Sequence, residues 1–119
     1  MWSNRRDADY LQDMLEAMER ILAYTVGMSQ EQFLNDTRTQ DAVVRNIEVI
    51  GEAVKRLSEE VRHAYPDIPW RAMAGMRDKV IHHYFGVNYD VVWKVATEDV
   101  PSLLPRLKEI LEREKGSGG

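Results

Sequence analysis

Apolar residues recur at three- and four-residue intervals along most of this chain, and that spacing limits the folds the chain can adopt. An α-helix turns once in about 3.6 residues, so the spacing gathers apolar side chains on one face of each helix. The first such stretch runs from about Asp7 to Val26 and carries Leu11, Met14, Leu15, Met18, Ile21, Leu22 and Thr25. No segment alternates with a period of two, and no Asn-Gly or Asp-Gly turn occurs. The sequence therefore predicts an all-α fold.

Helix-capping residues mark the boundaries of the first two long helices. Gly27 is expected to end the first, and Ser29 with Gln32 resembles a capping box that opens a short connecting helix. Asp36 or Thr37 then caps a second long helix, whose apolar face consists of Val43, Ile47, Ile50, Val54 and Leu57. This connection is short, which favours antiparallel packing of the two helices.

The second half of the chain is expected to hold two further main helices. Pro69 suits the first position of a third helix that Gly86 closes, so residues 69–85 would form one continuous helix. Asn88 can cap the last helix, in which Pro101 and Pro105 must kink or split the helical hydrogen bonding. Four to five helices with short connections are most simply an antiparallel bundle.

The second long helix carries a glycine and a charged face. Gly51 lies close to the apolar side, where it costs up to about 1 kcal/mol relative to alanine, so it is expected to permit close approach of a neighbouring helix. The opposite side of this helix carries four charged residues, Arg45, Glu48, Glu52 and Arg56. These residues form either a solvated salt-bridge face or part of a second interface.

Composition fits a single soluble domain with a reducing environment. Residues 1–115 are expected to form one helical domain, and residues 116–119, which lack apolar side chains, a flexible tail or a remnant of cloning.

The net charge of -4 and the pI near 5.4 argue against an extended basic surface, so DNA is not expected as a partner, although a small cationic cleft is compatible with them. The absence of cysteine excludes thiolate metal sites and fits the cytoplasm. No apolar stretch approaches the ~20 residues that span a bilayer, so no membrane association is expected.

Arg77 needs an explanation because a helical wheel places it in the middle of the apolar stripe of the third helix. A guanidinium in that position is costly unless it is paired or faces a wet cleft. One interpretation is a buried ion pair with a carboxylate such as Glu52 or Glu48, and another is an arginine that extends to the surface. The third interpretation is that Arg77 faces a functional cleft.

Asp78 and His82 lie four residues apart, a spacing that lets a carboxylate hold an imidazole in one tautomer. This is acid–base geometry, and it is also ordinary surface chemistry. A straight helix would separate Arg77 from His82 by about 140°, so both reach one phosphate only through a local distortion or a second subunit of a twofold dimer. Metal binding is the weaker interpretation, because adjacent His82 and His83 diverge by about 100° on a helix.

The segment that ends at Tyr84 resembles the motif of a known family. Arg77, four intervening residues, His82, one further residue and Tyr84 match the pattern Arg-x(4–6)-His-x-Tyr of the HepT-like toxins in the HEPN superfamily. The surroundings agree in order: AVVRNIE at 42–48, IGEA at 50–53, IPW at 68–70, GMR at 75–77 and DVP at 99–101. The resemblance extends to about residue 112. Asp78 departs from the pattern, since asparagine is commoner there, and its role would shift from hydrogen-bond donor to acceptor.

The resemblance implies a homodimeric, metal-independent endoribonuclease without a cofactor, with a HEPN-like bundle and a composite cleft between subunits. His82 would be the general acid–base group for attack of the ribose 2'-hydroxyl on its own phosphodiester. Arg77 would stabilise the charge of the transition state, with Asp78 as a third member of the site. A supporting polar face would consist of Arg45, Glu48 and Glu52.

The resemblance also implies a partner and an off-switch. The usual partner in the family is a minimal nucleotidyltransferase antitoxin of the MNT type, which transfers AMP to the motif tyrosine, so Tyr84 is the expected modification site in a type VII-like toxin–antitoxin pair. An adenylyl group beside Arg77 would fill the cleft and compete for its charge. The alternative is a non-catalytic helical module that binds or regulates the nucleotidyltransferase. The acidic pI favours this alternative slightly, and the intact set of Arg77, His82 and Tyr84 favours the ribonuclease more.

Overall fold

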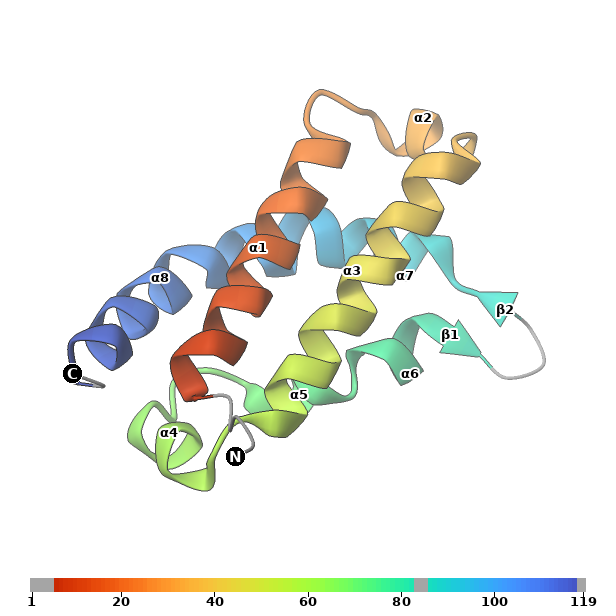
Figure 1. The fold of residues 1–119 in the computed structure, drawn as a ribbon. Coiled ribbons are helices and arrows are strands. Elements are labelled where there is room, and N and C mark those ends of the chain that lie inside the picture. Colours follow the sequence, from red (N-terminus) through yellow and green to blue (C-terminus); the bar gives the residue numbers. More distant parts are fainter. Residues whose placement is uncertain (1–5, 83–85, 118–119) are drawn as a thin grey trace, which may run out of the picture.

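Two long antiparallel helices, α1 and α3, form the centre of the fold (Figure 1). The computed structural model describes residues 6–82 and 86–117. α1 (Asp7–Thr25) and α3 (Thr37–Arg56) lie side by side, and the short α2 (Gln30–Leu34) connects them. The antiparallel arrangement follows from the short connection, because the chain must turn back on itself before α3 begins.

The middle of the chain forms short elements, of which α5 and α6 lie along the C-terminal half of α3 (Figure 1). These are α4 (Glu59–Ala64), α5 (Trp70–Ala74), α6 (Met76–Val80), and a hairpin of β1 (Ile81–His82) and β2 (Gly86–Val87). α5 and α6 both pack against α3. Apart from this small hairpin the described residues are helical or in connections, and the predicted all-α class is confirmed.

The last part of the chain is one uninterrupted helical stretch that crosses α1 and α3 (Figure 1). It consists of α7 (Tyr89–Lys94), a π-helical turn η1 (Val95–Asp99) and α8 (Val100–Ser117). α8 packs against α1 and closes the core on that side. None of the helices within residues 6–82 and 86–117 combines the length and the apolar character that a bilayer span requires.

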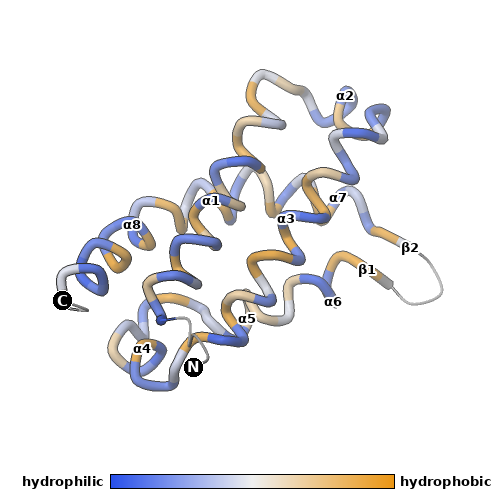
Figure 2. The backbone as a smooth tube through the Cα atoms, in the orientation of Figure 1, coloured by the Kyte–Doolittle hydropathy of each residue, from blue (hydrophilic) through white to orange (hydrophobic). Residues whose placement is uncertain are grey.

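The core lies between α1, α3 and the last helical stretch. Figure 2 shows apolar positions recurring once per turn along α1 and α3, as the spacing in the sequence predicts. The predicted apolar face of α3 is confirmed, since Val43, Ile47, Ile50, Val54 and Leu57 are all buried. The facing residues of α1 are buried as well: Leu11, Met14, Leu15, Ala17, Met18 and Ile21.

The predicted helix caps of the first half are confirmed. Gly27 follows α1 with a φ of 75°, a left-handed conformation that suits glycine. The Ser29–Gln32 capping box is present, with the Gln32 amide donating to the Ser29 hydroxyl at 3.1 Å and the Ser29 amide donating to the Gln32 side chain at 2.8 Å. Asp36 caps α3 by accepting from the Thr39 amide at 3.1 Å and from its hydroxyl at 2.8 Å.

The cap at Asp36 predicts a specific loss of stability in acid. Because the Asp36 carboxylate accepts hydrogen bonds from Thr39, first of all from its backbone amide, its pKa is lowered in the folded state. A depressed folded pKa stabilises the fold above the unfolded value, and this contribution is lost as pH falls below about 4. Asp36→Asn keeps the capping oxygen without the titration. We expect urea unfolding to show that wild type has a higher free energy of unfolding than Asp36→Asn at pH 6, and that this difference is lost by pH 3. A difference in stability that does not change with pH would contradict the assignment.

The third helix does not have the predicted extent. A continuous helix over residues 69–85 was expected, but α5 ends at Ala74, α6 ends at Val80, and Ile81 is extended with φ -109° and ψ 112°. The chain leaves the helix because Ile81 pairs with Val87 in the hairpin, and both side chains pack against the core. Gly86 adopts the expected positive φ, at 78°, but in β2 and not as a helix cap.

Gly51 permits the close contact that the sequence predicts. A Cβ placed on Gly51 would lie 3.4 Å from the Ala74 carbonyl oxygen and 3.6 Å from that of Met73. The neighbour of α3 at this point is therefore the backbone of α5 itself. Any large side chain at residue 51 would separate the two helices.

The prolines of the last helical stretch alter its hydrogen bonding without ending it. Pro101 has no amide proton to donate, and the preceding turn, η1, is π-helical. Pro105 lies inside α8, which continues through Gly116 to Ser117. Of the predicted kink or split, the split is therefore absent, and the helix extends two residues into the segment expected to be a tail. Gly118 and Gly119 lie outside the described residues.

Candidate functional site

Arg77 lies on α6 beside α3, and its side chain is half exposed at 51%. The guanidinium Nε donates to the Glu48 carboxylate at 3.4 Å, and Nη1 lies 3.7 Å from the Asp78 carboxylate. The predicted position in the middle of a buried stripe is wrong. α6 is a short helix that buries Met76 and Val80, so Arg77 falls beside the buried face and reaches solvent.

Glu48 is one of the two carboxylate partners that the sequence offered for Arg77, although the ion pair between them is not buried. Glu48 retains 35% side-chain exposure, and the pair spans α3 and α6. A guanidinium has five N–H donors, of which Glu48 occupies one, so donors remain for an anion that approaches from solvent. The arrangement holds Arg77 in place and leaves it able to bind a phosphate.

The other members of the supporting polar face, Arg45 and Glu52, form no ion pair with Arg77 in the described structure. Arg45, Glu48, Glu52 and Arg56 line a groove of about 250 Å³ together with Tyr10 and Asp13 of α1. Glu52 pairs with Lys55 at 3.3 Å, three residues along the same helix. Glu48 is thus the member of this face that joins the groove to Arg77.

Asp78 and His82 do not share a helical face. Asp78 is 86% exposed, and its ion pair in the described structure is with Arg77. Because α6 ends at Val80, the four-residue spacing from Asp78 to His82 crosses from a helix into β1. The backbone of His82 pairs with Gly86, whereas its side chain lies outside the described structure, as do His83 and Tyr84.

The end of the helix at Val80 supplies the local distortion that the sequence required of a one-subunit site. On a continuous helix Arg77 and His82 would point about 140° apart. The extended backbone from Ile81 removes that relation, because residue direction in a strand alternates with each residue. The signal in the sequence that could have revealed this end is the pair of β-branched residues, Val80 and Ile81, followed by Gly86.

Within the described residues, no three His, Asp or Glu side chains lie together in a way that could hold a metal ion. The described part of the site consists of the Arg77 guanidinium and its carboxylate partners, Glu48 and Asp78.

Comparison with known proteins identifies the family. A family described as "Ribonuclease HepT-like" matches residues 14–110. A protein of Thermococcus cleftensis named "Probable ribonuclease HepT" is 47% identical over 106 residues, which cover 89% of this chain and 96% of the relative. A protein of Methanocaldococcus jannaschii is 46% identical over 107 residues (90% and 88%), and one of Caldanaerobacter subterraneus subsp. tengcongensis is 44% identical over 106 (89% and 95%). Both carry the name "Putative RNase". No solved structure gives a significant match. The chain belongs to the HepT-like ribonuclease family.

Proposed function

We propose that this HepT-like protein is a metal-independent endoribonuclease that acts on RNA in the cytoplasm as the toxin of a toxin–antitoxin pair. The observation that carries the proposal is Arg77, a half-exposed guanidinium fixed by Glu48 only four residues before the strand that contains His82. A cation fixed in this way is suited to a phosphodiester because it needs no reorganisation when charge develops. Membership of a ribonuclease family supports the same chemistry.

In the proposed reaction the RNA supplies its own nucleophile. The ribose 2'-oxygen attacks the adjacent phosphorus, so a bond from O2' to phosphorus forms while the bond from phosphorus to O5' breaks. A His82 imidazole accepts the 2'-hydroxyl proton, and an imidazolium donates a proton to the leaving 5'-oxygen. Arg77 stabilises the negative charge on the phosphorane oxygens. The products are a 2',3'-cyclic phosphate and a 5'-hydroxyl.

A twofold dimer supplies two histidines for these two proton transfers. One His82 then serves as the base and the other as the acid, within a composite cleft that also contains two copies of Arg77. Asp78, which is exposed beside Arg77, orients groups at the mouth of this cleft. The dimer is part of the proposal, as is the absence of any cofactor.

Control of the toxin is proposed to act through Tyr84. A minimal nucleotidyltransferase of the MNT type transfers AMP to the phenol oxygen, with loss of pyrophosphate from ATP. The added adenylyl group carries a negative charge, seven residues after Arg77 in sequence, and is proposed to compete with RNA phosphate for the Arg77 guanidinium. The modified protein is therefore inactive towards RNA.

The chemistry is tested with RNA that lacks its nucleophile. Purified protein is incubated with a labelled RNA, and with the same RNA carrying 2'-O-methyl groups, in the presence of excess EDTA. We expect cleavage of the unmodified RNA to 2',3'-cyclic phosphate ends, and no cleavage of the blocked RNA, because the attacking oxygen is methylated.

Two outcomes would contradict the proposal. Cleavage that stops in EDTA and returns with a divalent ion would show a metal-dependent reaction. Tight binding to the nucleotidyltransferase and labelling of Tyr84, without any RNA cleavage by the free protein, would identify the chain as a non-catalytic partner. A preparation of His82→Ala purified in parallel controls for contaminating nucleases.

A further inference from the structure

An open groove of about 870 Å³ lies between α4 and α5, outside the proposed cleavage site. Its polar lining consists of Arg62, His63 and Arg71, and none of the residues that line it is acidic. Exposed Pro66 and Pro69 contribute apolar surface. We call this surface the basic groove.

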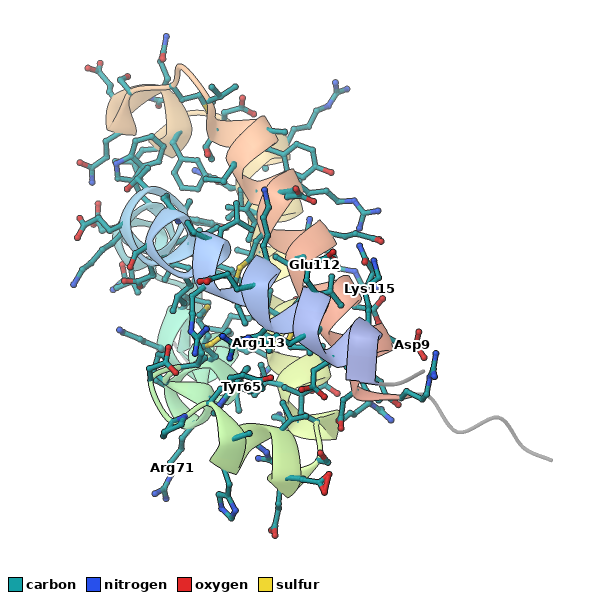
Figure 3. All side chains as sticks on the ribbon, turned by 90° about the vertical axis from the view of Figure 1, so that its left-hand side faces the viewer. Asp9, Tyr65, Arg71, Glu112, Arg113 and Lys115 are labelled. Carbon is teal, nitrogen blue, oxygen red and sulfur yellow. The ribbon has the colours of Figure 1, made fainter. Side chains whose placement is uncertain are left out.

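The arginines of the basic groove are not neutralised. Within the described structure neither Arg62 nor Arg71 forms an ion pair. Arg62 donates from Nη2 to the Leu57 carbonyl oxygen at 3.0 Å, and its buried Nε has no partner. Arg71 is exposed and projects from the edge of the molecule (Figure 3). One cation is thus anchored and the other is free to follow a ligand.

The acidic residues nearest in sequence do not cancel this charge. Asp67 accepts from Arg106 Nε at 2.7 Å and from Nη2 at 3.3 Å, and these bonds keep the Asp67 pKa below its ordinary value. Its charge is therefore matched by Arg106 at neutral pH. Glu59 and Glu60 lie in the first turn of α4 and do not line the groove. In a chain with net charge -4, the groove is a surface on which positive side chains gather without lining carboxylates.

One end of the basic groove is near Arg77 in the chain. Ala74 lines the groove and precedes Arg77 by three residues, across Gly75, which joins α5 to α6. An extended polyanion in the groove can therefore continue over the turn at Gly75 to α6, which carries Arg77.

We infer that the basic groove binds the phosphate backbone of single-stranded RNA and delivers it to the site around Arg77. This inference rests on the proposed ribonuclease function. Adjacent phosphates of one strand can contact Arg62 and Arg71, while sugars and bases lie on the apolar surface of Pro66 and Pro69. An acidic peptide matches the charge of the groove. It lacks the regular alternation of phosphates with sugars and bases that would use both the arginines and the apolar surface of the prolines.

The test measures binding separately from cleavage. A fluorescent 2'-O-methyl RNA, which cannot react, is titrated with wild type, Arg71→Glu and Arg38→Glu by anisotropy over a range of salt. Arg38 is the matched control because it is also an exposed arginine without an ion pair in the described structure, at the opposite end of α3. We expect Arg71→Glu to raise the Kd about fivefold to tenfold at low salt and to reduce the salt slope by about 0.7, with Arg38→Glu within about twofold of wild type.

Cleavage kinetics distinguish failure of this inference from failure of the proposed function. If the wild type cleaves unmodified RNA, Arg71→Glu is expected to raise KM about fivefold to tenfold with kcat within about twofold. If Arg71→Glu and Arg38→Glu weaken RNA binding equally, or if neither weakens it, the assignment of RNA binding to the basic groove is wrong. The proposed nuclease function is unaffected by that result. A poly-glutamate peptide that binds in an Arg71-dependent manner, with RNA binding unaffected, would assign the groove to an acidic protein segment and overturn it as well.

Discussion

Replacement of His82 by alanine is expected to lower the rate of RNA cleavage by about 10²- to 10⁴-fold, because the reaction loses its general acid–base group. Arg77→Ala is expected to cost about 10²- to 10³-fold, since the transition state loses a positioned cation. Both effects should appear mainly in kcat, because the interactions strengthen as charge and proton move. Single-turnover cleavage of a labelled RNA measures them directly.

Conservative variants separate chemistry from folding. Arg77→Lys keeps the charge but loses the planar fork, so it should recover only part of the lost rate. The double variant Arg77→Ala/His82→Ala should be little slower than the worse single variant, because the two groups act in one step. Arg77 and Glu48 are both substantially exposed, so unfolding by urea should change little in Arg77→Ala. Chelator-resistant cleavage that survives in His82→Ala would remove His82 from the mechanism.

Gly51→Leu is expected to reduce the free energy of unfolding by about 1–3 kcal/mol, because its side chain meets the backbone of α5 and cannot be accommodated by a rotamer change. The carbonyl oxygens of Ala74 and Met73 lie 3.4 Å and 3.6 Å from the position of a Cβ at residue 51. Since α5 is followed directly by α6, the same change should displace Arg77 and lower cleavage. Urea unfolding and cleavage assays on the same preparation measure both effects.

Gly51→Ala is the matched control for this prediction. A single methyl group at 3.4 Å makes an ordinary contact, and alanine gains about 1 kcal/mol of helix propensity over glycine. We therefore expect Gly51→Ala to be at least as stable as wild type and to retain Arg77 in place. If Gly51→Leu were as stable and active as Gly51→Ala, the contact between α3 and α5 would not position the site.

The first half of the fold was accessible from the sequence because local signals agree there. α1 and α3 are long, so their apolar periodicity extends over several turns and their buried faces can be assigned. Local residues also mark boundaries: Asp36 caps the start of α3 through a residue three positions on, and Gly27 follows the end of α1 with a positive φ. Such signals do not depend on the rest of the molecule.

The end of the third helix was missed because it depends on a short hairpin whose sequence signal is weak. Apolar spacing continues through Ile81, so the pattern alone extends the helix. The competing structure is a hairpin of two-residue strands, which are too short to show a period of two. The amide of Asn88 also donates to the Val80 carbonyl oxygen at 2.7 Å, a bond that no local pattern predicts.

The candidate site was predicted in part. The sequence offered Glu48 and Glu52 as partners of Arg77, and the helical wheel could not choose between them because the register of α6 on α3 is a tertiary property. The exposure of Arg77 was missed because the prediction placed Arg77 on one long helix, whereas α6 ends at Val80. The roles of His82 and Tyr84 came from the family pattern and stay predictions.

The end of α6 at Val80 separates the position of Arg77 from the length of the chain that follows it. One residue added within a continuous helix would rotate every later residue by about 100° relative to Arg77. A residue added after Val80 leaves α6 unturned, and its effect falls on the pairing of Ile81 with Val87 and of His82 with Gly86. A change of length in the segment with His82 is therefore taken up in the hairpin, while the contact of Arg77 with Glu48 is kept.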